Sequence, residues 1–212
     1  MRRFRLVAFG AFLILAATPW LAGCKGPFRV PGLSFSFPDS APGYVSTVHV
    51  PDTLSLISSV DRRRAHLGED VAGTGWDACE ADTLPDGAVP KLVDQRLSQA
   101  IEASGLFTRV SRNDQSAIWS LAPEVTVFCS QTRGFIGRRV AGLVGLSVIL
   151  RKSGKVVWHE EFQRVVTDAD PEYSGDFVTT VEQAMRRTMA DALRVVLHDA
   201  LAALSRVVRD GR

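Results

Sequence analysis

Histidine and cysteine, the side chains that most often bind metals or attack substrates, are scarce in this chain, with four and three copies. His159-Glu160 opens like a zinc-protease motif, which needs a second histidine four residues on and a helix that places both on one face. Position 163 is glutamine, and the segment alternates like a strand, so we predict no zinc site there. The other histidines lie near no serine or cysteine motif, and we expect surface or core-edge imidazoles; they are His49, His66 and His198.

Phosphate binding and acid–base catalysis also lack a recognisable motif. Glycines recur between positions 134 and 145, but neither Gly-Lys-Ser/Thr nor a helix start follows them. They predict a flexible turn and close backbone contacts in a strand; they are Gly134, Gly137, Gly142 and Gly145. Glu160 and Glu161 have no identifiable partner, and strand alternation turns at least one of them to water. We expect no enzymatic activity, no metal site and no cofactor. The alternative is an envelope hydrolase whose catalytic residues come together only in the folded structure.

The first of the three cysteines, Cys24, lies near the start of the chain. Three arginines precede an apolar run, Leu6 to Leu15, which is shorter than the roughly 20 residues a membrane-spanning helix needs. Leu21-Ala22-Gly23-Cys24 resembles the lipobox of bacterial lipoproteins, in which the cysteine is lipidated and becomes the first mature residue. The alternative is an ordinary signal peptide. The resemblance implies a leader over 1–23, a lipid on Cys24 and, because Lys25 rather than aspartate follows, the periplasmic face of the outer membrane, with the inner membrane as the alternative.

The other two cysteines, Cys79 and Cys129, form an even pair in an exported protein, which favours a disulfide. Two buried free thiols are the alternative. Removing 23 residues from 212 leaves 189, with 22 basic and 23 acidic side chains and a net charge of −1. A nearly neutral mature chain gives no electrostatic reason to expect nucleic acid as a partner.

One predicted loop combines apolar and basic side chains. Residues 133–139 should join two strands, with apolar residues at the tip and arginines around it: Arg133, Phe135, Ile136, Arg138 and Arg139. This composition suits a protein partner or a lipid headgroup surface. The alternative is that Phe135 and Ile136 fold back against the edge of the core.

The elements that position these residues follow from proline, glycine and periodicity. Residues 24–43 hold four prolines and three glycines and predict a tether, and a single α+β domain should span 44–210. At its start we expect short strands over Val45–Val50, stopped by Pro51-Asp52, and over Leu54–Val60. A solvated run of three arginines, 62–64, and an acidic loop from 68 to 87 should follow.

The remainder alternates clearly between helical and strand periodicity. Helical spacing predicts one helix over Pro90–Ser104 and a long amphipathic one from Thr179, in a capping box with Glu182, to about Val208. Strands are expected over Leu106–Val110, Ile118–Cys129, Val140–Leu150 and Val156–Val166, the last two joined by a hairpin at Ser153-Gly154. The predicted fold is an antiparallel sheet of four to five strands with two helices packed on one face.

Four stretches resemble the ABC-type transport auxiliary lipoproteins, partners of paraquat-inducible, MCE-type lipid transport systems. They are "VPDTL", "LSQAIEASGLFTRV", "LAPEVTVFCSQ" and "GKVVWHEEF", followed by the long C-terminal helix. The loop from Arg62 to Gly87 departs from the family pattern. The resemblance implies a non-enzymatic accessory that binds an MCE protein or ABC permease and supports lipid or solute movement between membranes. The alternative binding role is an outer-membrane lipoprotein that activates cell-wall synthesis or supports a secretion machine.

Overall fold

The computed structural model describes residues 43–79, 89–133, 139–168 and 177–211. The strands are β1 (Val50–Leu56), β2 (Val60–Asp61), β3 (Phe107–Arg112), β4 (Trp119–Arg133), β5 (Arg139–Lys152) and β6 (Lys155–Asp168). The helices are α1 (Val89–Ser104) and α2 (Phe177–Asp210), and two short 3-10 turns are η1 (Arg63–His66) and η2 (Val71–Gly73). The predicted leader, Cys24 and the tether lie outside the described residues.

The six strands form one mixed sheet, so the prediction of a purely antiparallel sheet was wrong. The order is β3-β1-β4-β5-β6, with β2 paired to β4 beyond the end of β1. The strands β4, β5 and β6 are antiparallel neighbours, as the hairpin signal predicted. In contrast, β1 is parallel to both β3 and β4. The chain leaves β1, passes through α1 and enters β3 beside it, and a helical crossover of this kind joins parallel strands.

The first strand begins where we expected a strand to end. Pro51 and Asp52 lie within β1, at a break in its register with β3, and such irregularities accommodate a residue without an amide hydrogen. Val45 precedes the sheet and is 75% exposed. The predicted strand over Leu54–Val60 is divided between the end of β1 and the two-residue β2.

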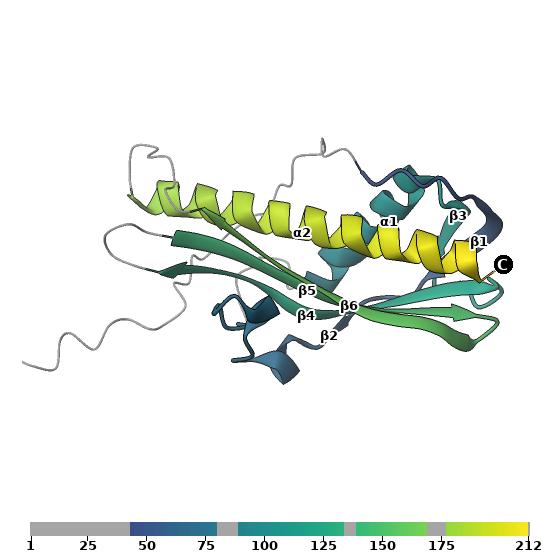
Figure 1. The fold of residues 1–212 in the computed structure, drawn as a ribbon, viewed down its shortest axis with the longest axis horizontal. Coiled ribbons are helices and arrows are strands. Elements are labelled where there is room, and N and C mark those ends of the chain that lie inside the picture. The colour runs from purple at the N-terminus through teal and green to yellow at the C-terminus, as the bar shows by residue number, and fades with distance from the viewer. Residues whose placement is uncertain (1–42, 80–88, 134–138, 169–176, 212) are drawn as a thin grey trace, which may run out of the picture.

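Both helices cover one face of the sheet, here called the upper face, as predicted (Figure 1). The helix α2 has 34 residues, a length of about 51 Å, and lies across β5 and β6 with α1 beside it. The apolar face of this amphipathic helix is buried, including Met189, Leu193 and Leu201, with Val207 partly buried near its end. Thr179 lies within the first turn of α2 rather than before it, so the predicted capping box was wrong.

Two bulges change which face a side chain occupies. Thr126 is an extra residue in β4, so Val125 faces the helices while Val127 faces the opposite side. Plain alternation along the predicted strand places Val125, Val127 and Cys129 on one face, and the bulge makes this prediction wrong. Val157 is similarly extra in β6, which leaves Val156 57% exposed although Trp158 packs against the helical core.

Glycine lets α2 approach the sheet closely. A Cβ atom on Gly142 would lie 2.3 Å from the Thr188 carbonyl carbon and 2.4 Å from the Met189 nitrogen. Gly145 is similarly enclosed by Thr126 and Val127. The close contacts predicted for strand glycines are confirmed at these two positions, while Gly134 and Gly137 lie outside the described residues.

Candidate functional site

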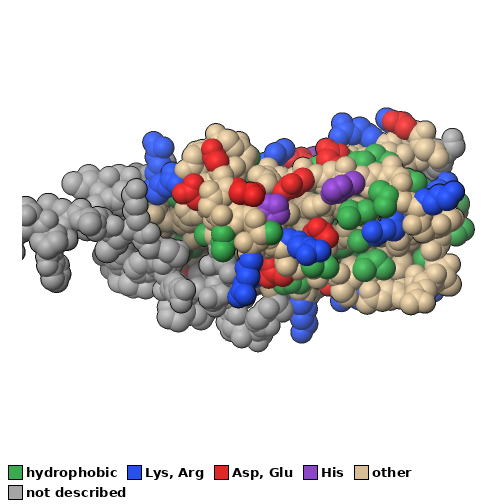
Figure 2. All heavy atoms as spheres, turned by 90° about the horizontal axis from the view of Figure 1, so that it is seen from below, with side chains coloured by type: hydrophobic (Ala, Val, Ile, Leu, Met, Phe, Trp, Pro, Cys, Tyr) green, Lys and Arg blue, Asp and Glu red, His purple; other side chains and the backbone are tan. Residues whose placement is uncertain are grey.

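A second, smaller core covers part of the lower face of the sheet, opposite the helices. The segment from η1 to Cys79 folds beneath β4 and β5 (Figure 1) and buries Val71, Trp76 and Ala78. These side chains pack on Val127, Cys129, Ala141 and Leu143 of the sheet. Seen from this side, apolar, basic, acidic and histidine side chains are interspersed over the surface (Figure 2).

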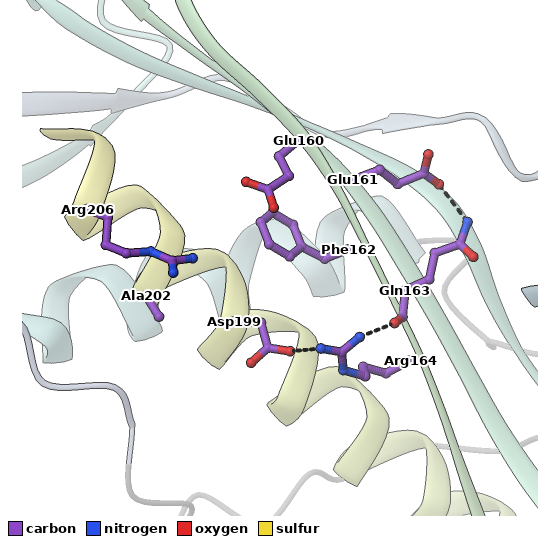
Figure 3. A pocket seen from close by; sticks show the side chains of 8 residues that line it. All are labelled: Glu160, Glu161, Phe162, Gln163, Arg164, Asp199, Ala202 and Arg206. Carbon is purple, nitrogen blue, oxygen red and sulfur yellow. Dashed lines mark hydrogen bonds and ion pairs between the residues drawn. The ribbon is translucent and has the colours of Figure 1, made fainter. Parts of the chain in front are cut away.

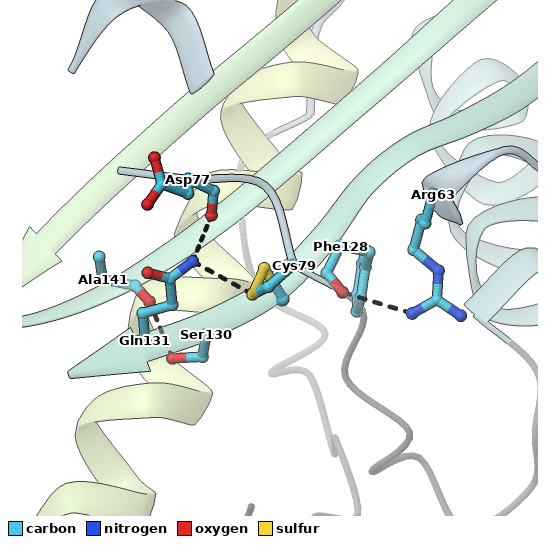
Figure 4. Close-up of a disulfide and its surroundings, with 8 residues drawn as sticks. Arg63, Asp77, Cys79, Phe128, Ser130, Gln131 and Ala141 are labelled. Carbon is cyan, nitrogen blue, oxygen red and sulfur yellow. Dashed lines mark hydrogen bonds between the residues drawn. A yellow bond between two sulfur atoms is a disulfide. The ribbon is translucent and has the colours of Figure 1, made fainter. Parts of the chain in front are cut away.

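A disulfide joins this segment to the sheet. Cys79 and Cys129 are bonded, with Cα atoms 5.9 Å apart and a separation of 50 positions in the sequence (Figure 4). This is the first of the two alternatives that the sequence left open. The Gln131 side-chain amide donates to the Asp77 carbonyl and lies 3.2 Å from the Cys79 sulfur. The covalent bond and the amide together hold the end of the segment against β4.

Arg133, predicted to belong to a partner or membrane surface, packs on this same segment. Its guanidinium lies 4.2 Å from the centre of the Trp76 ring and donates to the Gly75 carbonyl at 2.5 Å. Arg139 lies opposite it at the start of β5 and is exposed. Phe135, Ile136 and Arg138 lie outside the described residues, so the surface predicted for this loop stays a prediction.

The arginine run at 62–64 was predicted to be solvated, and this is wrong for Arg63, which is 8% exposed. Its guanidinium donates to both Asp61 carboxylate oxygens and, at 3.5 Å, to the Phe128 carbonyl of β4. The hydrogen bond from the Arg63 side chain holds the pKa of Asp61 below its ordinary value, although partial burial opposes this shift. Arg63 thus bonds β4 beyond the point where β2 ends.

A groove runs between β6 and the C-terminal half of α2 (Figure 3). Its volume is about 440 Å³. Its walls are Phe162 and Ala202 with mostly charged neighbours: Glu160, Glu161, Gln163, Arg164, Asp199 and Arg206. Arg164 bonds Asp199 across the groove at 2.5 Å. One apolar ring among charged groups can bind a peptide or a polar headgroup. The sequence reasoning missed this groove because its two walls are 35 or more residues apart.

The histidines do not converge on a catalytic or metal site in the described part of the chain. His159 lies 2.9 Å from the buried Ser147 hydroxyl, but the described hydrogen bonds include no carboxylate that orients its ring as a triad requires. His66 bonds Glu69, and His198 stacks edge-on against Tyr44. No group of three potential metal ligands occurs among the described residues, and none of the helices described there is long and apolar enough to cross a membrane.

Comparison with known proteins shows likeness in fold. No family model and no curated protein matches the sequence. A Xanthomonas campestris protein of the family-model DUF330 has a TM-score of 0.54 at 15% identity, over 87% of this chain and 95% of that one. Weaker likenesses, at 12% identity, include lipoprotein B from Nitrosomonas europaea (TM-score 0.39; 81% and 95% covered) and a minor lipoprotein from Acinetobacter baumannii (0.37; 76% and 94%).

Proposed function

We propose that the chain is an envelope lipoprotein, tethered through a lipid on Cys24, whose folded domain lies in the periplasm. The observation that carries this proposal is the disulfide between Cys79 and Cys129, which closes the lower-face core. Structural disulfides form in oxidising compartments, which is where a chain with a lipobox-like export signal is delivered. The domain begins about 20 residues after Cys24, which leaves room for a tether.

The role that we propose within the envelope is that of an accessory to an ABC- or MCE-type system that moves lipids or solutes. The four stretches that resemble the auxiliary lipoproteins form the frame of the domain: the start of β1, the α1–β3 connection, β4, and β6. The structural likeness to the DUF330 protein covers 87% of this chain. It is thus broad enough to include the elements that contain these four stretches. A groove with an apolar ring and paired charges suits binding to a partner.

Lipidation and localisation are tested together. We expect the wild-type chain to incorporate labelled palmitate and to fractionate with membranes, because several acyl chains on one residue anchor firmly. Cys24→Ser should abolish both, whereas Lys25→Asp should keep the label and move the protein from the outer to the inner membrane. If Cys24→Ser fractionates like the parent, the anchor proposal is wrong.

The accessory role needs a separate experiment. A photo-crosslinking residue at Phe135 or Ile136, in cells, should capture an MCE protein or an ABC permease, identified by mass spectrometry. The same residue at Val45, which is 75% exposed near the start of the domain, is the matched control. Capture of cell-wall synthesis or secretion components would favour the alternative binding role. Recovery of only soluble periplasmic proteins would count against transport, even if lipidation is normal.

A further inference from the structure

The outer edge of β6 has no strand beside it in the described part of the sheet. This strand has 14 residues and pairs only with β5, whereas the opposite edge, β3, has six. An edge strand presents a row of unpaired amides and carbonyls, and natural proteins usually shorten such edges, place proline, charged residues or a bulge in them, or cover them. The strand β6 is among the longest in the sheet and contains no proline, and its bulge lies near its start, at Val157. The segment after the bulge is therefore long and regular enough to pair with another strand if its charges meet complementary ones.

We propose that two copies of this chain pair through β6, antiparallel, about a twofold axis that passes by Phe162. A twofold axis perpendicular to a continuous sheet keeps each residue on its own face. Residues directly opposite each other must then both have even or both have odd numbers, because alternate residues point to opposite faces. The axis therefore lies at a residue and not between two residues, and only a few registers remain to be compared.

The register centred on Phe162 brings complementary side chains together. On the helix side, Phe162 faces its own copy, Glu160 faces Arg164 and, next along, Trp158 faces Val166. On the lower side, Glu161 faces Gln163 and His159 faces Val165. Opposite charges and aromatic–aliphatic pairs across strands are each stabilising. Twofold symmetry repeats every one of these pairs except that on the axis.

The two adjacent registers place less favourable residue pairs opposite each other. Centring the pair on Glu161 places two glutamates directly opposite each other, which is destabilising. Centring it on Gln163 places Phe162 opposite Arg164 and Glu160 opposite Val166, so each charge faces an apolar side chain. The bulge at Val157 lies outside the segment 158–166 that would pair, so the ladder is regular where the proposal needs it.

The groove beside α2 also favours a second copy of this chain as the partner of β6. Its β6 wall contains Glu160, Phe162 and Arg164, the helix-side residues of the proposed pairing. Figure 3 shows the Phe162 ring between β6 and α2 with Glu160 and Arg206 near it. A second β6 lying alongside would place its own Glu160 and Arg164 next to this groove, while each Phe162 stays buried beneath its own α2. The β6 pairing involves the folded domain alone and does not depend on the envelope role.

Thiol crosslinking of the purified full chain, in mild detergent, tests the register. Opposite residues in antiparallel strands have Cα atoms about 4.5–5.5 Å apart, which a disulfide can bridge. Phe162→Cys should give a covalent dimer under mild oxidation. Glu160→Cys alone should not, because its two copies would be offset by four residues, about 13 Å. A mixture of Glu160→Cys and Arg164→Cys chains should crosslink. Efficient self-crosslinking of Glu160→Cys, or no crosslinking at any of the three, would overturn the proposal.

Charge reversal tests the pairing without replacing Phe162. Because Arg164 also bonds Asp199, all charge variants are made in an Asp199→Asn background. Glu160→Arg and Arg164→Glu each place like charges opposite twice per dimer and should weaken dimerisation roughly tenfold, while the double reversal should restore it. Sedimentation measures the dissociation constant, and thermal unfolding checks the fold. A monomer at every concentration, or a double variant no tighter than the singles, would contradict the proposal.

Discussion

The two faces of the sheet are covered in different ways. On the upper face, two helices bury a continuous apolar core, and α2 alone contributes some ten of its residues, among them Met189, Val196 and Leu204. On the lower face, a segment with only short 3-10 turns buries seven residues and is held by a disulfide, an amide and two arginines. Buried apolar area is sufficient to hold the helices on the upper face. The irregular segment on the lower face buries less, and the disulfide and hydrogen bonds hold it in place.

Removing the disulfide should reveal the largest difference in stability between the coverings of the two faces. In Cys79→Ala/Cys129→Ala we expect stability to fall by up to about 4 kcal/mol, the chain-entropy value for a loop of this length. Amides of residues 63–79 should lose protection from hydrogen exchange, while those of α2 keep theirs until global unfolding. Urea unfolding and exchange mass spectrometry measure the two effects. Equal loss of protection on both faces would show that the lower cover is not a separate unit.

A substitution at Gly142 tests how closely α2 packs on the upper face. Gly142→Ala places a methyl group against the α2 backbone, which cannot move aside as a flexible side chain does, so we expect a loss of about 3 kcal/mol. Gly43→Ala is the control, since no atom lies within 4 Å of its added carbon. Urea titration of both variants gives the free energies. A loss at Gly142 no larger than at Gly43 would mean that α2 lies farther from β5 than described.

Arg63 tests the polar bonds of the lower cover. Arg63→Met keeps the apolar stem and removes the guanidinium that bonds Asp61 and the Phe128 carbonyl, so we expect a loss of about 1–2 kcal/mol. Arg62→Met is the matched control, because Arg62 is exposed and contacts Glu124 at 3.7 Å. Thermal unfolding of the two variants should differ; if they are equally stable, Arg63 does not hold the segment.

The smallest effect concerns pH. The pKa of Asp61 is lowered in the folded chain, so its carboxylate stabilises the fold above the ordinary value near 3.8. This contribution is lost as the pH falls through the lowered pKa. Asp61→Asn should therefore show a shallower loss of stability below about pH 4. The carboxylate is partly exposed and screened, so the difference is small. Parallel acid titrations that coincide would contradict this assignment.

Much of the fold was predictable because it follows local periodicity. The helix over Pro90–Ser104 was expected within one residue of α1, and the β5–β6 hairpin was marked by Ser153-Gly154. The segment 62–79 was not predictable, because its buried residues Arg63, Val71 and Trp76 follow no period. Of the candidate site residues, Cys79 and Cys129 could be named from sequence, whereas the groove around Phe162 could not.

The sequence by itself determined the apolar rows of α2, the alternation of the antiparallel strands and the even cysteine pair, since each of these depends on neighbours along the chain. Only the tertiary structure decided that β1 is parallel to β3 and β4, that Thr126 turns Val127 to the lower face, and that β6 forms an edge beside α2. These features depend on contacts between residues far apart in the chain, where steric fit and backbone hydrogen bonding select one arrangement among several that local patterns allow.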